Sequence, residues 1–401
     1  MSIYLKKFST HAEYETYIAS EDNVLPNVSI CTTEGDVHYN PVPPHDYSQD
    51  YFTMVVTNGG GIKFSGSTTA NTLSYSKDNG DNWTTANSST TISVVEGDKV
   101  LWKGTPTPVN GIGKFSGDTN VRYSVEGNVM SLLFGGDFKG QTSLEGKDSA
   151  LRSLFFDNTN VTSAENLSLP ATTLADYCYQ SMFFRCTSLT TAPELPATTL
   201  ADNCYVQMFY GCTSLTTAPK LPATTLTTYC YHQMFNGCTS LTTAPKLPAT
   251  KMTDYCYNSM FEGCTSLTTA PKLPATTLAL QCYGDMFYDC TNLTSAPSIL
   301  PATTLADGCY SYMFYGCTSL TTAPELPATS LTQSCYSYMF QNCTSLSSIK
   351  CLATNISARY CTTNWVYGVS ASGTFIKAAS MSRWSTGVPN GIPDGWTVQD
   401  A

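Results

Sequence analysis

A 26-residue unit that occurs seven times in succession constrains the fold of this chain more than any other feature. One copy reads LPATTLADNCYVQMFYGCTSLTTAPK, from Leu195 to Lys220. Every step is 26 residues except one of 27, where Ile299 is inserted. A Met-Phe pair marks each copy, at Met182, Met208, Met234, Met260, Met286, Met313 and Met339. This period predicts a solenoid of stacked units, a class that mostly presents surfaces and rarely does chemistry.

Positions are counted here from the first cysteine of each repeat, which is position 0. Apolar residues recur at 0, +4, +5, +8, +11, +14 and +17, which are Cys204, Met208, Phe209, Cys212, Leu215, Ala218 and Leu221 in one copy. The step of four predicts one or two helical turns, and the later steps of three predict a tight coil that leads to a short strand. Because one unit can bury its apolar side only against its neighbours, equivalent residues should stack into cysteine, phenylalanine and leucine ladders.

Fourteen of the 17 cysteines form pairs eight residues apart, one pair in each repeat. This regularity indicates a packing role, and the absence of C-x-x-C argues against zinc and thioredoxin-type sites. Free cysteine behaves as a small buried apolar group, so we expect reduced core thiols. Disulfides between stacked repeats are the alternative. Many reduced thiols fit assembly in a cytoplasm.

The frame C-Y-x-x-M-F-x-G-C-T-S-L-T-T-A resembles the leucine-rich repeats of the Treponema/BspA-like type, whose unit reads roughly I-x-x-x-A-F-x-x-C-x-x-L-x-x-I. Cysteine replaces the first isoleucine, methionine replaces alanine, and alanine replaces the last isoleucine. The resemblance covers residues 151–401 and implies a leucine-rich-repeat solenoid with terminal caps.

Both ends of this region are expected to be caps, at about 151–169 and 352–401. At the start, Leu154-Phe155 stands for Met-Phe, and Asn158 replaces the second cysteine. At the end, Trp365-Val366 stands for Met-Phe, and Trp384 and Trp396 should cover the last repeat. BspA-like arrays commonly finish with Gly-Thr-Phe and Gly-Trp-Thr-Val segments similar to those of this tail.

Positions +2, +3 and +6 vary between repeats while the frame stays fixed, which predicts that they face solvent. Drift on an exposed surface explains such variation, and so does a recognition face, since tyrosine is enriched at binding surfaces. The candidate recognition face consists of Phe184, Tyr210, Asn236, Glu262, Tyr288, Tyr312, Tyr315, Tyr338 and Gln341. The tyrosine at +1 is the same in all seven copies, which favours packing between repeats over a binding role.

Residues 1–45 are expected to form a small α+β attachment segment, with a helix over residues 8–19 and two short strands, VSIC and DVHY, before a proline-rich spacer. Its YLKKF and VHYN motifs resemble the N-terminal segments of structural proteins from crAss-like Bacteroides phages. That resemblance implies docking on capsid or tail proteins. The candidate attachment residues are Tyr4, Leu5, Phe8, Tyr14, Tyr17 and Ile18.

Residues 50–150 are predicted to form an all-β sandwich, because the apolar runs YFTMVVT, TLSYS, TISVV, KVLWKG, VRYSV and VMSLLF are separated by Gly, Asn and Asp clusters. GIKFSG recurs as GKFSG, a weak internal duplication. Ser76, Asp78, Gly80 and Trp83 resemble the Asp-box hairpin of sialidases and other β proteins. We expect a turn device from this motif and no catalysis.

Composition and motifs exclude several classes of function. Only 12% of residues are charged and the net charge is −10, so nucleic-acid binding is not expected. No apolar run is long enough to span a membrane, and no apolar stretch follows Lys6 and Lys7, so no signal peptide is expected. We also expect no catalytic residues, cofactor or metal. His232, beside Cys230, is interpreted as a surface residue.

The sequence thus predicts a multidomain, non-enzymatic structural or adhesion protein. The leading hypothesis is a phage virion fibre, a head or tail appendage that is assembled in the host cytoplasm and docked by its N-terminus. Its repeats would bind a host surface protein or glycan, and fibres are usually symmetric, so a dimer or trimer is expected. The alternative is a bacterial BspA-like adhesin on the cell surface.

Overall fold

The computed structural model describes residues 45–66, 73–107, 110–382, 384–387 and 389–401, together with two short strands nearer the N-terminus. The chain divides into two compact units, Met1–Asp46 and Tyr47–Ala401, and each is considered by itself. In the first unit, β1 (Ile30–Cys31) and β2 (Val37–His38) pair antiparallel, which confirms the two strands expected there. The helix expected over residues 8–19 lies outside the described residues, and so do all six candidate attachment residues.

The second unit begins with a 3-10 turn, η1 (Tyr47–Gln49), and two antiparallel groups of strands. The strands are β3 (Phe52–Asn58), β4 (Gly60–Gly66), β5 (Leu73–Ser76), β6 (Thr84–Ala86), β7 (Thr91–Val94), β8 (Lys99–Lys103), β9 (Gly113–Gly117) and β10 (Arg122–Asn128). A six-stranded sheet, which also includes β11 (Val161–Ser168), has the order β11-β10-β3-β8-β5-β6, and a three-stranded sheet has the order β7-β4-β9. The duplicated GIKFSG and GKFSG segments are β4 and β9, which pair with each other.

These two sheets share an aromatic core. The ring centroid of Trp102 on β8 lies 6.4 Å from that of Phe64 on β4 and 4.8 Å from that of Phe115 on β9. All three side chains are buried. The expected strand over residues 129–134 is wrong, because this segment forms a short helix, α2 (Ser131–Phe134), followed by η2 (Gly135–Asp137). A short apolar run does not distinguish a buried strand from a buried helix.

The six-stranded sheet extends into the repeat region. Its edge strand β11 (Val161–Ser168) pairs in parallel with β10. The boundary expected near residue 150 therefore lies inside one compact unit with a continuous hydrophobic core.

The first half of each repeat is a ribbon of consecutive turns, and the expected helical turns are wrong. Alternate amides bond in two directions: Tyr205 N donates to Cys230 O in the next repeat (3.1 Å), whereas Val206 N donates to Asn203 O in its own repeat (3.3 Å). Positions −1, +3 and +7 are left-handed, with φ of 59° at Asn203 and 55° at Gln207. This alternation satisfies every second amide between repeats. The left-handed residue at every fourth position gives the chain its period of four without a helix.

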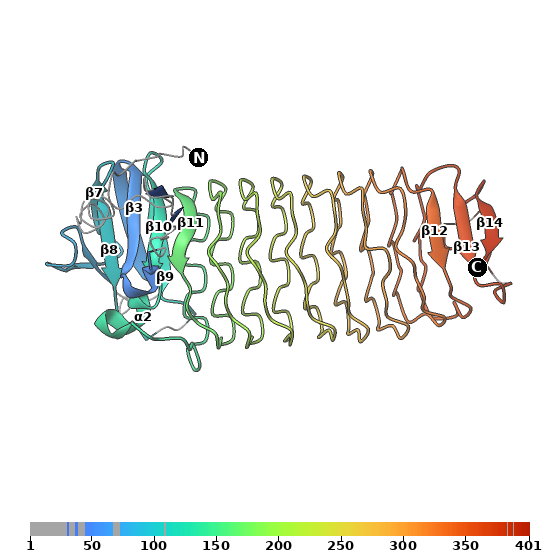
Figure 1. The fold of residues 1–401 in the computed structure, drawn as a ribbon, viewed down its shortest axis with the longest axis horizontal. Helices are drawn as coiled ribbons and strands as arrows, with labels where there is room; N and C mark the ends of the chain where they lie inside the picture. The colour runs from blue at the N-terminus through green and yellow to red at the C-terminus, as the bar shows by residue number, and fades with distance from the viewer. Residues whose placement is uncertain are drawn as a thin grey trace. The chain divides into compact units, whose positions relative to one another are not determined.

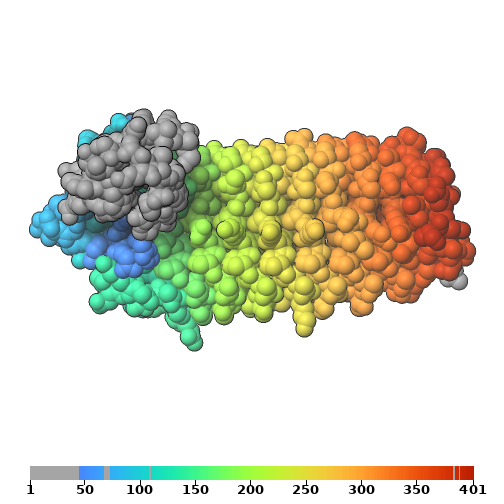
Figure 2. All heavy atoms as spheres, in the orientation of Figure 1, coloured from blue at the N-terminus to red at the C-terminus, as the bar shows by residue number. Residues whose placement is uncertain are grey.

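The second half of each repeat is nearly extended, and neighbouring repeats meet there through single parallel bridges such as Thr217 with Thr243. Figure 1 shows the repeats side by side between β11 and β12. Figure 2 shows equivalent side chains of successive repeats in rows on the visible surface. The described chain is mostly β in character and almost without helix, which confirms the coarse fold class.

The expected ladders fill the interior. Phenylalanines at +5, from Phe155 to Phe340, stack with centroids 5.1–5.8 Å apart and planes within 11°. Tyrosines at +1, from Tyr179 to Tyr336, stack at 5.6–6.1 Å and are about 1% exposed, so their packing role is confirmed. The cysteines from Cys178 to Cys361 are buried and unpaired.

The second cysteine of each repeat has a specific partner. Cys212 Sγ donates to Phe183 O (3.0 Å), and Cys238 Sγ donates to Phe209 O (3.1 Å). The same bond recurs in seven successive repeats, between 2.9 and 3.1 Å. The +8 cysteine therefore fills core volume and also ties its repeat to the preceding one.

Residues at both ends of the repeat array contact other parts of the unit. At the start, Asn158 Nδ2 donates to Phe115 O (3.0 Å) and to the Tyr123 hydroxyl (2.7 Å), so this amide takes the place of the cysteine bond. At the end, Trp384 stacks on Trp365 at 5.4 Å. A parallel sheet of β12 (Ser348–Cys351), β13 (Thr374–Lys377) and β14 (Thr397–Asp400) follows the last repeat (Figure 1).

Candidate functional site

The candidate recognition face lies on the turn ribbon, where positions +3 and +6 form two columns along successive repeats. Eight of its nine residues are half-buried, and Asn236 is buried, at 7% exposure. The backbone places these side chains, because +3 is left-handed in each repeat, as at Asp285 (φ 55°) and Tyr312 (φ 57°). Non-glycine residues are uncommon in this conformation, and it is held here by the bonds between repeats.

The +6 column has aromatic residues in two places. Phe184 is stacked between Phe156 and Tyr210, whose centroids lie 4.6 and 4.7 Å from its own, and Tyr288 stacks on Tyr315 at 4.4 Å. Between these two stacks the column holds Asn236 and Glu262, whose side chains share a hydrogen bond. The structure therefore divides the predicted face into two aromatic stacks separated by a polar pair.

The +3 column adds two tyrosines to the second aromatic pair. Tyr312 stacks on Tyr338 at 4.5 Å and also contacts Tyr315 at 6.0 Å and Tyr288 at 6.3 Å. These four residues are called the tyrosine cluster below. Asn342 Nδ2 donates to the Tyr315 hydroxyl (3.1 Å), and Gln341 Oε1 is buried without a protein partner.

Three carboxylates adjoin the tyrosine cluster: Glu262, Asp285 and Asp289. Burial raises the pKa of the Asp285 carboxyl to about 7, and the negative charge of Glu262 adds to that rise. Burial also raises the pKa of Glu262 and of Asp289. Among the ion pairs of the described residues, none includes these carboxylates. The cluster therefore carries negative charge with no neutralising cation.

The sequence interpretation missed Asp289, and it took Asp285 as one of the carboxylates scattered over the solvated surface, outside the candidate recognition face. Asp285 is at +3 and Asp289 is at +7, a position held by glycine in four other repeats, as at Gly263 and Gly316. An acidic residue where other repeats have glycine is the signal that could have identified Asp289. Asp285 could have been found from its +3 position beside the tyrosines of the next two repeats.

The prediction that position +2 faces solvent is wrong. Val206, Asn258, Ser311 and Ser337 are buried at this position, so +2 is largely directed inward. His232, expected on the surface, is half-buried; burial lowers its pKa, and its Nδ1 has no protein partner. The turn ribbon explains the difference, because it buries three successive positions, as at Cys204, Tyr205 and Val206.

The Asp-box segment forms the turn that the sequence predicts. Asp78 Oδ1 accepts from Ser76 Oγ (2.6 Å) and from Asn82 N (2.9 Å), and Trp83 Nε1 donates to Gly80 O (2.9 Å). The hydrogen bond from Ser76, followed by those from Asn82, lowers the pKa of Asp78 to about 2. Asp78 thus links β5 to β6 as an ionised acceptor in the turn, and its bonds are all local.

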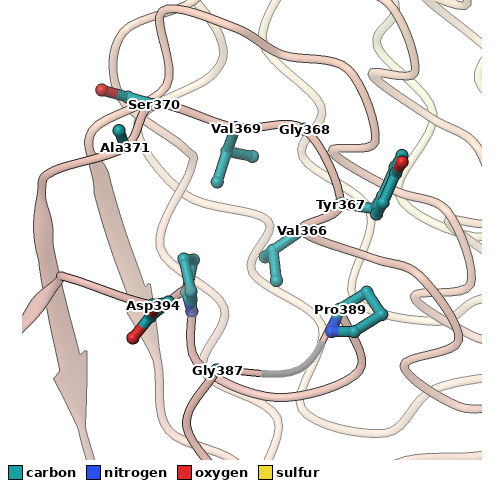
Figure 3. A pocket seen from close by; sticks show the side chains of 10 residues that line it. Val366, Tyr367, Gly368, Val369, Ser370, Ala371, Gly387, Pro389 and Asp394 are labelled. Atoms are coloured by element: carbon teal, nitrogen blue, oxygen red, sulfur yellow. The ribbon is translucent and has the colours of Figure 1, made fainter.

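A pocket of about 300 Å³ lies in the C-terminal segment, lined mainly by apolar and small residues that include Val366, Val369 and Pro389, with Tyr367 and Asp394 at its sides (Figure 3). Within the described ranges, no group of three or more His, Cys, Asp or Glu side chains could hold a metal ion. The same part of the chain contains no helix of the length and apolar character that a membrane span needs.

Comparison with known families follows the repeat geometry. Residues 150–294 and 254–364 match the BspA type leucine rich repeat region, in six copies. The chain belongs to the BspA-type leucine-rich-repeat family. The match spans the array in which the cysteine, phenylalanine and tyrosine ladders lie, and it accounts for more than half of the chain.

One solved structure that resembles this BspA-type protein is a leucine-rich repeat protein from Bacteroides ovatus ATCC 8483. It is 14% identical, with a TM-score of 0.24, and the likeness covers 70% of this chain and 95% of the other. No curated protein matches the chain.

Proposed function

We propose that this BspA-type protein is a non-enzymatic, adhesin-like binding protein that presents the +3 and +6 columns of its repeats to a partner on another surface. The observation that carries the proposal is the contrast between columns. The ladders at 0, +1, +4, +5 and +8 are uniform and buried, whereas +3 and +6 vary and gather four tyrosines with two carboxylates, beside a third carboxylate at +7. Tyrosine-rich surfaces with polar neighbours are typical of protein-binding sites.

The scaffold suits this role. We propose that the repeat array is a solenoid with the β region and the C-terminal segment as its caps, as solenoids need at their ends. Backbone bonds between repeats, such as Gln207 N to His232 O (2.9 Å) and Phe209 N to Met234 O (2.9 Å), support rigid columns. A rigid surface loses little conformational freedom on binding, which favours affinity.

The test compares adhesion of the full chain with that of a variant in which the four tyrosines of the cluster become glutamine. Glutamine stands at +3 in Gln207 and Gln233 and at +6 in Gln341, so the fold should tolerate it. A matched control replaces the tyrosines at −1, Tyr177, Tyr229 and Tyr255, with glutamine, which Gln281 shows at that position. We expect the cluster variant alone to lose binding to target cells; equal binding by all three proteins contradicts the proposal.

The virion-fibre hypothesis remains a prediction, together with N-terminal docking and a symmetric oligomer. It rests on the resemblance of residues 1–45, few of which the structure describes. Detection of the protein in purified virions, and its loss from them on deletion of residues 1–45, would support it. A chain made with an export signal and found on the bacterial surface would favour the adhesin instead.

A further inference from the structure

In both columns of the recognition face, a carboxylate is followed by a tyrosine in the next repeat. Glu262 precedes Tyr288 at +6, and Asp285 precedes Tyr312 at +3. Tyr288 is stacked on Tyr315 with planes 5° apart, and Tyr312 on Tyr338 with planes 10° apart, so each pair covers one ring face. The other faces of Tyr288 and Tyr312 are therefore directed along the array toward the carboxylate-bearing repeats. This place is called the carboxylate–tyrosine junction.

The charges at the junction are coupled to the rings. The carboxylate of Asp285 contributes to the raised pKa of Tyr312, and the carboxylates of Asp289 and Glu262 contribute to that of Tyr288. Burial is the largest cause in each case. The groups that face Asp285 are Glu262, Tyr312 and the amide of Asn258, which also bonds His232. The junction thus combines two ring faces with partly buried negative charge.

The first aromatic stack of the same column has a guanidinium next to its rings. Phe184 is stacked between Phe156 and Tyr210, so both its faces are covered, and the Arg185 guanidinium carbon lies 5.6 Å from its centroid. Arg185 is at +7, the position that Asp289 occupies beside Tyr288. That stack therefore has a guanidinium of the chain beside it, whereas the tyrosine cluster has carboxylates and no cation among the described ion pairs.

We propose that the carboxylate–tyrosine junction binds arginine side chains from an arginine-bearing segment of a partner protein. A guanidinium is planar, stacks on aromatic faces and pairs with a carboxylate through two parallel hydrogen bonds, whereas the lysine ammonium is a compact point charge. Two ring faces, each with a carboxylate at the same position of the preceding repeat, match this chemistry. The net charge of −10 attracts a basic partner to the surface. This inference rests on the proposed function and gives its partner a chemical class.

The direct test measures binding of a fluorescein-labelled hexa-arginine peptide to the full chain by anisotropy, at pH 8 and low salt. Asp285→Asn, Glu262→Gln and Tyr312→Gln are each expected to weaken binding about five- to tenfold, as loss of one charge-assisted or cation–π contact implies. The matched controls are Glu194→Gln, an exposed carboxylate outside the junction, and Tyr177→Gln, an exposed aromatic at −1 outside the recognition face. Both controls should bind like the parent protein.

Three results would overturn the inference. The first is an equal loss in the Glu194→Gln control, which would indicate attraction by net charge alone. The second is equal affinity for a hexa-lysine peptide, and the third is unchanged peptide binding by the Asp285→Asn variant. Displacement of the peptide by a neutral oligosaccharide would point to a glycan and would also count against it. The variant with all four cluster tyrosines replaced by glutamine separates the two proposals. If the peptide binds as predicted and this variant still binds cells, the proposed function fails and the arginine site stands.

Discussion

Replacement of Asp285 by asparagine should stabilise the protein at pH 8 while it weakens the proposed site. The folded state raises the pKa of this carboxyl from 3.8 to about 7, mainly through burial and then through Glu262. The folded protein therefore keeps a proton that the unfolded chain has already lost, so stability falls as pH rises from about 4 to about 7. At about 1.4 kcal/mol per pKa unit, the penalty at pH 8 is about 4 kcal/mol.

Asparagine should remove this penalty without a new backbone cost. Asp285 is left-handed, with φ of 55°, and asparagine already occupies +3 in that conformation at Asn364, with φ of 49°. Asparagine is among the residues that adopt this conformation most readily. The amide also keeps the size of the protonated carboxyl, so the bond with Asn258 can persist.

The assay is urea unfolding of the parent chain and the Asp285→Asn variant, followed by circular dichroism at several pH values between 3.5 and 8. The gain of the variant should be near zero at pH 3.5, should grow through pH 5 and 6, and should level off above pH 7. Repeat proteins can unfold in parts, so equal denaturant slopes for the two proteins are required for the comparison. A gain that does not change with pH, or a variant less stable at pH 8, would refute the reasoning.

Three further outcomes follow from the same structure. Cys238→Ala should cost about 2 kcal/mol in urea unfolding, because it removes buried volume and the Sγ bond to Phe209 O, and Cys238→Ser, which keeps a donor, should cost less. Phe261→Ala should cost about 3–5 kcal/mol, since it empties the middle of the phenylalanine ladder, and a cost below 1 kcal/mol would contradict the stacking argument. Asp78→Ala should speed amide exchange at Asn82, which donates to Asp78, and at Gly80, which donates to the Ser76 hydroxyl that Asp78 holds, and should leave amides of the repeats unchanged.

The interior of the repeat was predictable because stacking gives every position the same neighbours in each repeat. A residue type that recurs at +1 or +5 in each copy must pack against its own equivalents, and the tyrosine and phenylalanine ladders do so. The backbone was less accessible to sequence reasoning. A step of four from Cys204 to Met208 suits a helical turn and also suits the turn ribbon, in which every fourth residue is left-handed.

The sequence pattern does not distinguish a helical turn from the turn ribbon, and this also limits what it indicates about the candidate recognition face. Variation at +3 and +6 predicted a solvent face, and the structure finds these positions half-buried apart from the buried Asn236. Variation at +2 gave a false signal, because Asn258 and Ser311 fit an interior position whose volume differs between repeats. Distances across repeats decide which variable residues meet, and the contact of Tyr312 with Tyr315 depends on a ribbon geometry that the sequence pattern does not specify.

At the start of the array, the packed core continues into a region where the repeat pattern is absent from the sequence. Residues before 150 lack the repeat frame, yet Phe115 on β9 stacks on Phe155 at 5.6 Å and donates its amide to Leu154 O (2.8 Å). Phe183 makes the equivalent bond to Met208 O within the array (2.9 Å). Phe52 then stacks on Phe115 at 5.6 Å, so the phenylalanine ladder continues for two residues into the β sheets. Because Asn158 supplies the bond of the missing cysteine, the β region acts on the first repeat as a preceding repeat would, and disruption at Phe115 should destabilise both together.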